Sequence, residues 1–162
     1  MHTGSCLCGA VKFTVEGELK APDACHCTQC RKTSGHYWVS TDVPRKALKV
    51  DGEFNVAWFR SSDKIQRGFC STCGASLFWD PVERDSISVA MGAFDAPTGT
   101  HIKKHIYVAD KGDYYEIRDG LPQNEQCPRG IPPRRVPRWR ARSRRARCGP
   151  GRAARNTSCI PH

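Results

Sequence analysis

Three cysteines stand within a stretch of six residues, at Cys25, Cys27 and Cys30. Cysteine thiolates are good ligands of Zn²⁺ in tetrahedral sites, and a site with three protein ligands keeps its fourth position open for a reactant. The spacing therefore predicts a zinc ion that takes part in chemistry. The alternatives are a second structural zinc, completed by a ligand such as His26 or His36, and a site that holds no metal.

Two further cysteine pairs lie on either side of this stretch, Cys6 with Cys8 and Cys70 with Cys73. The first pair can share a zinc with the cysteines of the central stretch, in a zinc-ribbon-like site, or with the second pair, in a closed four-thiolate site. Both pairs end in Cys-Gly, which suggests matching turns that face one another and favours the second arrangement. Spacing alone leaves both arrangements open.

The formal charge of +10 is concentrated at one end of the chain. Residues 127–162 contain 11 Arg and no Lys, Asp or Glu, which leaves 15 Lys and Arg against 16 Asp and Glu in residues 1–126. We therefore expect one compact domain over residues 1–126 and a separate basic tail over residues 127–162. The tail has few large apolar residues to offset the entropy of ordering, so we expect it to be disordered.

Three interpretations of this tail remain open. Its Arg side chains would support salt-dependent binding to the phosphates of a nucleic acid. A tail that is simply solvated is an equal alternative. We favour a shifted reading frame or a cloning read-through, because runs of Arg, Pro, Ala and Gly are what GC-rich DNA encodes out of frame. Sequencing the coding DNA tests this interpretation.

The sequence has no feature of a membrane or secreted protein. It contains no apolar run of about 18 residues, the minimum for a transmembrane helix, and its first residues lack the charged and apolar regions of a signal peptide. We therefore expect a cytoplasmic protein without a membrane partner, whose clustered cysteines bind metal rather than form disulfides. Residues 1–126 also hold seven cysteines, an odd number that a complete disulfide framework does not use.

Short runs of alternating apolar and polar residues, separated by Gly, Pro, Asp and Ser, dominate residues 1–126. Alternation is the pattern of half-buried strands, and no segment keeps a sustained helical period. We therefore predict an all-β fold, or nearly so, with Trp38, Trp58 and Trp79 in its core. The expected strands cover residues 10–15, 36–41, 54–60, 65–69, 76–79, 86–91, 105–109 and 114–118, and a turn is expected at residues 50–52.

Longer motifs around the cysteines resemble one known family. These motifs are Gly-Ser-Cys-Leu-Cys-Gly at residues 4–9, Cys-His-Cys-Thr-Gln-Cys-Arg-Lys at residues 25–32, and Phe-Cys-Ser-Thr-Cys-Gly at residues 69–74. They are similar to those of the glutathione-dependent formaldehyde-activating enzyme (GFA) family, which shares its domain with centromere protein V. The resemblance runs from Gly4 to Gln123. Tyr114-Tyr115 stands where the family commonly has Trp, and we find no counterpart of the basic tail in the family.

The resemblance implies a Mss4-like, zinc-stabilised β fold with two zinc ions per chain. By matching motifs it assigns Cys6, Cys8, Cys70 and Cys73 to a structural zinc, and Cys25, Cys27 and Cys30 to a catalytic zinc. It also implies a carbon–sulfur lyase, like S-hydroxymethylglutathione synthase, that joins a small thiol such as glutathione to formaldehyde or a related aldehyde. Zinc lowers the pKa of a bound thiol, and the resulting thiolate can attack a carbonyl carbon.

Several polar side chains are candidates for a role beside the cysteines. Arg31, Lys32 and His36 can meet the carboxylates of glutathione, because Arg pairs well with carboxylates; the alternative is a solvated basic turn. His26 lies between two ligands, so in an extended segment its side chain points away from them and takes a supporting or surface position. His105 either packs in the interior or lines a pocket.

Two functions of other classes compete with the enzyme. One is a non-catalytic zinc-binding module that engages a protein partner, as Mss4-like folds can. The other is a nucleic-acid-associated protein that uses its Arg-rich tail, since the nearly neutral domain gives nucleic acid no other basic surface.

Overall fold

The computed structural model describes residues 1–127, which form two β-sheets and one short α-helix. The smaller sheet has the strand order β1 (His2–Ser5), β2 (Lys12–Val15), β5 (Leu48–Asp51). The larger sheet has the order β11 (Gln123–Asn124), β10 (Lys104–Ile106), β3 (Asp23–Cys25), β4 (Trp38–Pro44), β9 (Ser86–Ala90), β8 (Ser76–Pro81), β7 (Ile65–Cys70), β6 (Val56–Arg60). The all-β prediction is confirmed. The tail prediction falls on residues 128–162, which lie outside the described residues.

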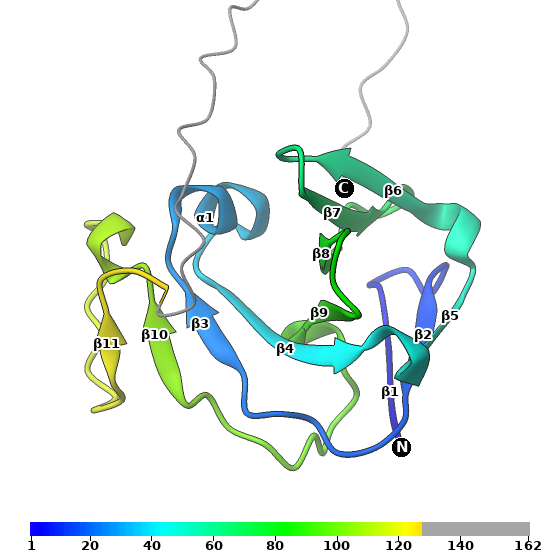
Figure 1. Cartoon of the computed structure of the whole chain (residues 1–162), viewed down its shortest axis with the longest axis horizontal. Coiled ribbons are helices and arrows are strands. Elements are labelled where there is room, and N and C mark those ends of the chain that lie inside the picture. The colour runs from blue at the N-terminus through cyan, green and yellow to red at the C-terminus, as the bar shows by residue number, and fades with distance from the viewer. Residues whose placement is uncertain (128–162) are drawn as a thin grey trace, which may run out of the picture.

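The larger sheet curls through an arc, and the smaller sheet lies at one side of it (Figure 1). Within the larger sheet, neighbouring strands pair antiparallel, except at the end that carries β10. There the pairs β3–β10 and β10–β11 are parallel. The main core joins the two sheets, because alternation turns Phe13 and Val15 of β2 inward against β8 and β9. The Phe13 ring meets Phe78 of β8 edge-on, with centroids 6.0 Å apart.

One short helix, α1 (Thr28–Ser34), departs from the strand pattern and lies in the three-cysteine stretch. Cys27 caps its amino end, because the sulfur accepts a hydrogen bond from the backbone N–H of Cys30 at 3.4 Å. Gly35 ends the helix in the left-handed conformation, with φ 82°, and donates its N–H to the carbonyl of Arg31 at 2.9 Å. A helix of 7 residues is too short to reveal its period in the sequence.

Several other elements differ from expectation. Residues 50–52, expected as a turn, include the end of β5, and the chain turns at Gly52, whose φ is 74°. Residues 114–118, expected as a strand, lie outside the strands, because the Tyr114 and Tyr115 rings pack on histidines. β1 and β3 were not expected, since one contains Gly and Ser and the other has 3 residues.

The three tryptophans have different environments. Trp38 is buried, Trp79 is half-buried, and Trp58 is 40% exposed, so the core assignment was wrong for Trp58. Trp58 lies on the edge strand β6 and stacks on Phe78 with ring centroids 6.0 Å apart. It therefore covers the core from the rim of the sheet.

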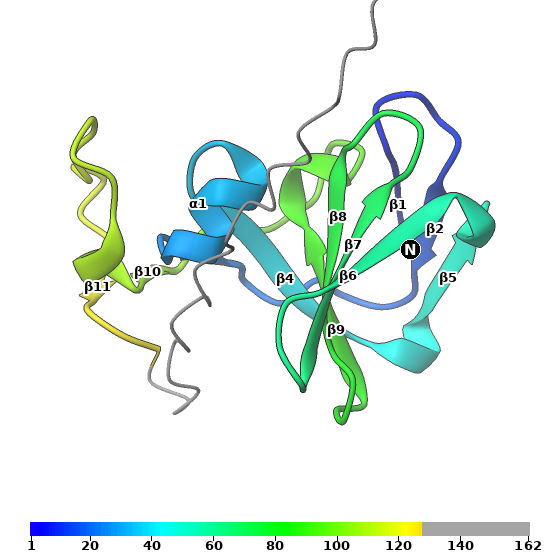
Figure 2. The ribbon, with the colours of Figure 1, turned by 90° about the horizontal axis from the view of Figure 1, so that it is seen from above.

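The fold brings the cysteines together from different elements. In the view of Figure 2, β6, β7 and β8 stand between α1 and the smaller sheet. One cysteine group is formed where β3 leads into α1, and the other is formed by the turns that follow β1 and β7. No helix within residues 1–127 is long and apolar enough to cross a membrane.

Candidate metal centres

The first candidate centre joins the two outer cysteine pairs. The sulfurs of Cys6, Cys8, Cys70 and Cys73 all lie within 4.8 Å of one another, with 3.5 Å between Cys6 and Cys8 and 3.7 Å between Cys8 and Cys70. Of the two pairings that the spacing left open, this is the four-thiol arrangement. All four cysteines are free thiols, so no disulfide competes for the sulfurs.

Two turns of similar construction hold these four sulfurs. The N–H of Cys6 donates to the carbonyl of Val11 at 2.9 Å, and the N–H of Cys70 donates to the carbonyl of Ala75, also five residues on, at 3.0 Å. Gly9 and Gly74 close the turns with φ of 76° and 75°, a conformation that favours glycine. The repeated Cys-Gly of the sequence therefore corresponds to a repeated backbone geometry.

Backbone amides stabilise negative charge on this group. The N–H of Val11 donates to the sulfur of Cys6 at 3.3 Å. The backbone N–H of Ala75 lowers the pKa of Cys73 to about 6. Four sulfurs at mutual contact distance, with amides directed at them, are a donor set that suits a tetrahedral zinc.

The second candidate centre is local. Cys25 ends β3, Cys27 caps α1 and Cys30 lies in the first turn of that helix, and their three sulfurs also lie within 4.8 Å of one another. Cys30 is buried, and the other two are half-buried. Trp38 and Ala90 pack beside them as a small second core.

The electrostatics of these three thiols call for a cation. Hydrogen bonds from Cys25 and Cys30 lower the pKa of Cys27 to about 2, and the hydrogen bond with Cys27 raises the pKa of Cys25 far above its usual range. These hydrogen bonds favour a thiolate at Cys27 and disfavour one at Cys25. A cation among the three sulfurs would stabilise all of them as thiolates, and soft sulfur ligands suit zinc.

A buried arginine lies against this group. Arg67 of β7 is 7% exposed, and its Nη1 and Nη2 approach the sulfur of Cys30 at 3.9 and 3.8 Å. Nη2 also donates to Oε1 of Gln29 at 3.1 Å. Sequence reasoning did not identify Arg67, although it occupies a position in step with Ile65 and Phe69, where a half-buried strand usually places apolar residues.

A chain of four polar side chains supports the segment between the ligands. Nε2 of His105 lies 2.8 Å from Oδ2 of Asp119, and Nδ1 of His105 lies 2.8 Å from Nε2 of His26. The hydroxyl of Tyr115 is hydrogen-bonded to Nδ1 of His26. Burial is the main cause that lowers the pKa of His26 to about 4, so His26 is neutral near neutral pH. Each group then donates to the next, in the direction Tyr115, His26, His105, Asp119.

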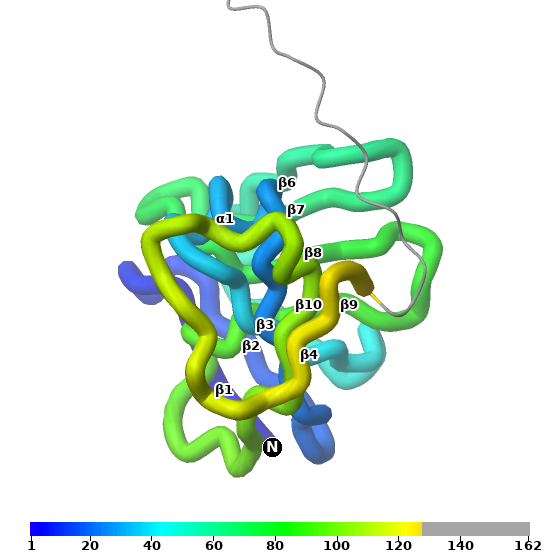
Figure 3. The backbone as a smooth tube through the Cα atoms, turned by 90° about the vertical axis from the view of Figure 1, so that its left-hand side faces the viewer, coloured from blue at the N-terminus to red at the C-terminus, as the bar shows by residue number. Residues whose placement is uncertain are grey.

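These four hydrogen-bonded side chains show which of the positions expected for His26 and His105 the two histidines take. His26 is fully buried, so the surface position is excluded, and its side chain is turned away from the three sulfurs toward Tyr115 and His105. His105 is buried as well. Tyr115 was noted from the sequence as one of an aromatic pair, but neither it nor Asp119 was expected at the site, because both come from the loop between β10 and β11. Figure 3 shows that loop laid over the side of the molecule beside α1 and β3.

The candidate substrate-binding residues lie at the far end of α1. Arg31 and Lys32 are in the last turn, and His36 follows the Gly35 cap. Nδ1 of His36 is 3.1 Å from the Tyr114 hydroxyl, whereas Lys32 is exposed and Nε of Arg31 is buried without a hydrogen-bond partner. Arg31 and Lys32 thus directly follow Cys30 along α1, whereas His36 lies against the Tyr114 hydroxyl.

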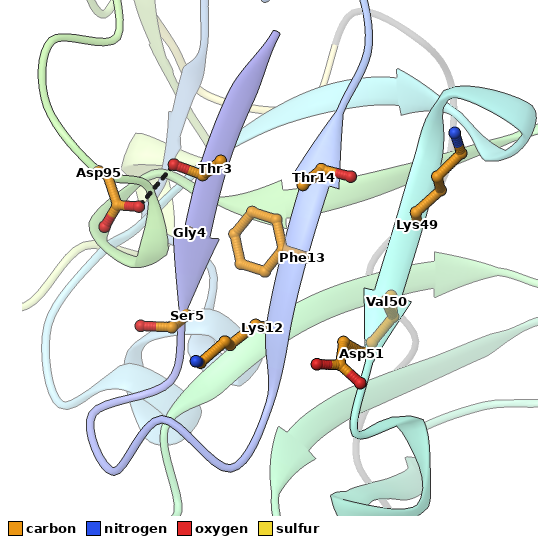
Figure 4. A pocket seen from close by; sticks show the side chains of 10 residues that line it. All are labelled: Thr3, Gly4, Ser5, Lys12, Phe13, Thr14, Lys49, Val50, Asp51 and Asp95. Atoms are coloured by element: carbon orange, nitrogen blue, oxygen red, sulfur yellow. Dashed lines mark hydrogen bonds between the residues drawn. The ribbon is translucent and has the colours of Figure 1, made fainter.

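A surface hollow of about 550 Å³ lies elsewhere, on the smaller sheet (Figure 4). Residues of β1, β2 and β5 line it together with Asp95, whose carboxylate accepts a hydrogen bond from Thr3 at 2.7 Å. None of the lining residues is a cysteine or a histidine. Within residues 1–127, the side chains that lie close enough together to hold a metal ion are those of the two cysteine groups and not those of the hollow.

Three comparisons bear on what this chain is similar to. The model of the glutathione-dependent formaldehyde-activating enzyme family matches residues 1–110. A Halomonas elongata protein, whose name proposes a glutathione-dependent formaldehyde-activating enzyme, is 28% identical over 149 residues, or 86% of this chain and 94% of that protein. A Schizosaccharomyces pombe protein named as an uncharacterized lyase is 30% identical over 78 residues, or 48% of this chain and 56% of that protein.

A solved structure of a Rhodobacter sphaeroides protein has the same fold, with a TM-score of 0.52 and 21% identity. It covers 62% of this chain and 98% of the other. The family model spans more than half of the sequence and includes both cysteine groups. The chain belongs to the glutathione-dependent formaldehyde-activating enzyme family.

Proposed function

We propose that this protein is a zinc-dependent carbon–sulfur lyase, which forms and cleaves S-hydroxymethylglutathione or a related adduct of a small thiol and an aldehyde. One observation carries the proposal: beside a four-thiol group that can enclose an ion, the fold holds a three-thiol group with one ligand fewer than a tetrahedral zinc needs. Two zinc ions per chain would fill the two groups, the first as a structural ion and the second as the catalytic one.

The reaction needs an activated thiol and a nearby carbonyl. A zinc ion in the three-thiol group would supply a Lewis acid that lowers the pKa of an incoming thiol. In the forward direction the thiol sulfur bonds to the carbonyl carbon and the carbonyl oxygen takes up a proton. In the reverse direction that carbon–sulfur bond breaks and the proton returns to the thiol. The reaction also runs without an enzyme, so positioning and thiol activation are the main tasks of the protein.

Residues of the chain divide these tasks. Cys25, Cys27 and Cys30 hold the ion, while Trp38 limits the access of water to Cys30. We assign Arg31, Lys32 and His36 to the carboxylates of the thiol substrate, since they lie on the turn that follows Cys30 and carry positive or ionisable groups. A reducing cytoplasm is the proposed location, because it keeps all seven clustered thiols available.

Exchange spectroscopy by NMR tests the activity. Formaldehyde and glutathione are mixed with the fully metallated protein, and the exchange rate between free and adduct signals is compared with the rate without protein. We expect acceleration by the wild-type chain and its loss in Cys27→Ser. Cys127→Ser is the matched control, because Cys127 belongs to neither metal-binding group and this variant should keep the wild-type rate.

If protein that carries two zinc ions does not accelerate the exchange between formaldehyde and glutathione, the proposal that it is an enzyme is wrong. A non-catalytic zinc module that engages a protein partner would then be the better interpretation. Nucleic-acid binding is tested separately, with the full chain and a chain that ends at Gln126. We expect any such binding to require residues 127–162 and to leave the thiol chemistry unaffected.

A further inference from the structure

Arg67 is a buried cation with no carboxylate beside it. None of the Asp and Glu side chains in residues 1–127 forms an ion pair with it. Its guanidinium contacts are the sulfur of Cys30 and the amide oxygen of Gln29, and its Nε has no hydrogen-bond partner. An isolated charge in the interior is costly, so a buried guanidinium needs an anion nearby.

The anion that fits is the metal centre itself. Three thiolates and one divalent ion sum to a charge of −1, and the guanidinium lies under 4 Å from one of those sulfurs. The Cys30 sulfur is buried as well, so water screens this contact poorly. Together the three thiolates, the ion and Arg67 form a neutral group.

The four-thiol group has no such contact among residues 1–127. Both groups receive a backbone N–H, from Val11 to Cys6 in one and from Cys30 to Cys27 in the other, but a buried guanidinium approaches a sulfur in the three-thiol group alone. The two groups therefore differ in charge compensation as well as in ligand number. A fixed cation suits the three-thiol group because none of its sulfurs belongs to an exposed residue, whereas Cys8 of the four-thiol group is exposed to water, which screens charge.

We propose that Arg67 is the counter-ion of the three-thiol centre, a positioning residue whose buried guanidinium offsets the net negative charge of three thiolates around a divalent ion and so strengthens divalent-metal binding at Cys25, Cys27 and Cys30. Arg67 acts through Cys30 and touches no substrate. Gln29 holds the guanidinium in place from the first turn of α1. The inference rests on the proposed metal site and adds to it a residue outside the ligand set.

Metal affinity, measured on the full chain, tests this role. Zinc is titrated against a chromophoric chelator in a non-thiol reductant, and the binding step that disappears in Cys27→Ser is assigned to the three-thiol centre. Replacement of groups that contact a metal ligand typically costs about 10- to 100-fold in affinity. We expect a loss of this size in Arg67→Gln and a smaller loss in Arg67→Lys, which keeps the charge.

Arg45→Gln is the matched control. Arg45 is also partly buried and forms an ion pair with Asp80, so its replacement disturbs the same sheet without touching the cysteines. We expect wild-type zinc affinity for this variant at the three-thiol centre. Circular dichroism verifies that each variant is folded before its affinity is compared.

The outcomes separate this inference from the proposed function. Wild-type affinity in folded Arg67→Gln, or equal losses in Arg67→Gln and Arg67→Lys, would overturn the counter-ion role and leave the enzyme untouched. A wild-type chain without a second binding step would overturn the metal site and with it both proposals. If Arg67→Gln does not fold, Gln29→Ala is measured instead, because it removes the amide that holds the Arg67 guanidinium. A zinc affinity about threefold or more below that of the wild type supports the counter-ion role, and an unchanged zinc affinity contradicts it.

Discussion

At the scale of single residues, the support behind the metal ligands is as informative as the ligands. The chain of Tyr115, His26, His105 and Asp119 fixes the residue between Cys25 and Cys27 without using either sulfur. His26 cannot rotate without breaking buried hydrogen bonds, so the two cysteines on either side keep their directions. These hydrogen bonds therefore hold the backbone between Cys25 and Cys27 in one arrangement, in which a metal ion would find both sulfurs already positioned.

Tyr115→Phe tests this support. The change removes one hydroxyl and leaves Nδ1 of buried His26 without its donor, and an unsatisfied buried polar atom costs about 1–3 kcal/mol. We expect the free energy of unfolding, measured by urea denaturation of the zinc-loaded protein, to fall by an amount in this range.

Tyr114→Phe provides the comparison at the neighbouring position. Tyr114 is 60% exposed, and its hydroxyl lies 3.1 Å from His36 in contact with solvent. In Tyr114→Phe, water can replace the lost hydroxyl as the partner of His36. We therefore expect the free energy of unfolding to change by no more than about 0.5 kcal/mol. Equal losses in the two variants would contradict the special role of the Tyr115 hydroxyl.

The sequence is informative about residues whose chemistry is visible in their type and spacing. Seven cysteines in three clusters indicated metal ligands, and the structure brings them into two groups. Arg67 and Tyr115 could not be found in this way, because a single Arg or Tyr is common in any strand or loop. Their roles follow from the distances that folding creates, such as the contact between Arg67 and a cysteine 37 positions away.

At the scale of elements, β7 connects the two cysteine groups. It carries Arg67 toward α1, ends at Cys70, and shifts its register against β8 between Gly68 and Phe69. A Cβ atom at Gly68 would lie 2.9 Å from the Trp58 ring and 3.0 Å from Phe78. Glycine at position 68 therefore leaves room for the Trp58 ring of β6 and the Phe78 ring of β8 to pack over β7.

Gly68→Ala is expected to destabilise the protein. The added methyl group forces the Trp58 ring to move, and overpacking of this kind costs about 1–3 kcal/mol. Gly92→Ala is the control, because a Cβ at Gly92 meets nothing within 4 Å. Urea denaturation followed by circular dichroism should separate the two variants, and a Gly68→Ala protein as stable as the wild type would show that the rim of the sheet yields freely.

Elements were predictable where alternation ran long enough. β2, β7, β8 and β9 match the expected strands closely, since their apolar residues fill one core. α1 and β3 were missed because each is shorter than the window in which a period can be recognised. In the loop between β10 and β11, Tyr114 and Tyr115 look strand-like in sequence, but histidine contacts determine where they lie.

At the scale of the whole molecule, the two cysteine groups connect the chain over different distances. The four-thiol group joins Cys8 to Cys70, which are 62 positions apart, and so ties the turns of the smaller sheet to β7. The three-thiol group lies within one stretch of six residues and closes no long loop. Because the entropy cost of closing a loop grows with its length, a metal ion in the first group would contribute more to folding than one in the second.

Cys70→Ser and Cys27→Ser should therefore affect the molecule differently. A structural zinc contributes on the order of 10–16 kcal/mol of apparent binding free energy, which is comparable to the whole stability of a domain, about 5–15 kcal/mol. We expect Cys70→Ser to lose its cooperative thermal transition, followed by far-ultraviolet circular dichroism in the presence of zinc. Cys27→Ser should keep that transition, since β3, α1 and the His26 contacts still hold the segment.

Elemental analysis should find one zinc per chain in Cys27→Ser and two in the wild type. A Cys27→Ser protein that unfolds as fully as Cys70→Ser would mean that both centres are needed for the fold, and the division into a structural and a reactive centre would then be wrong.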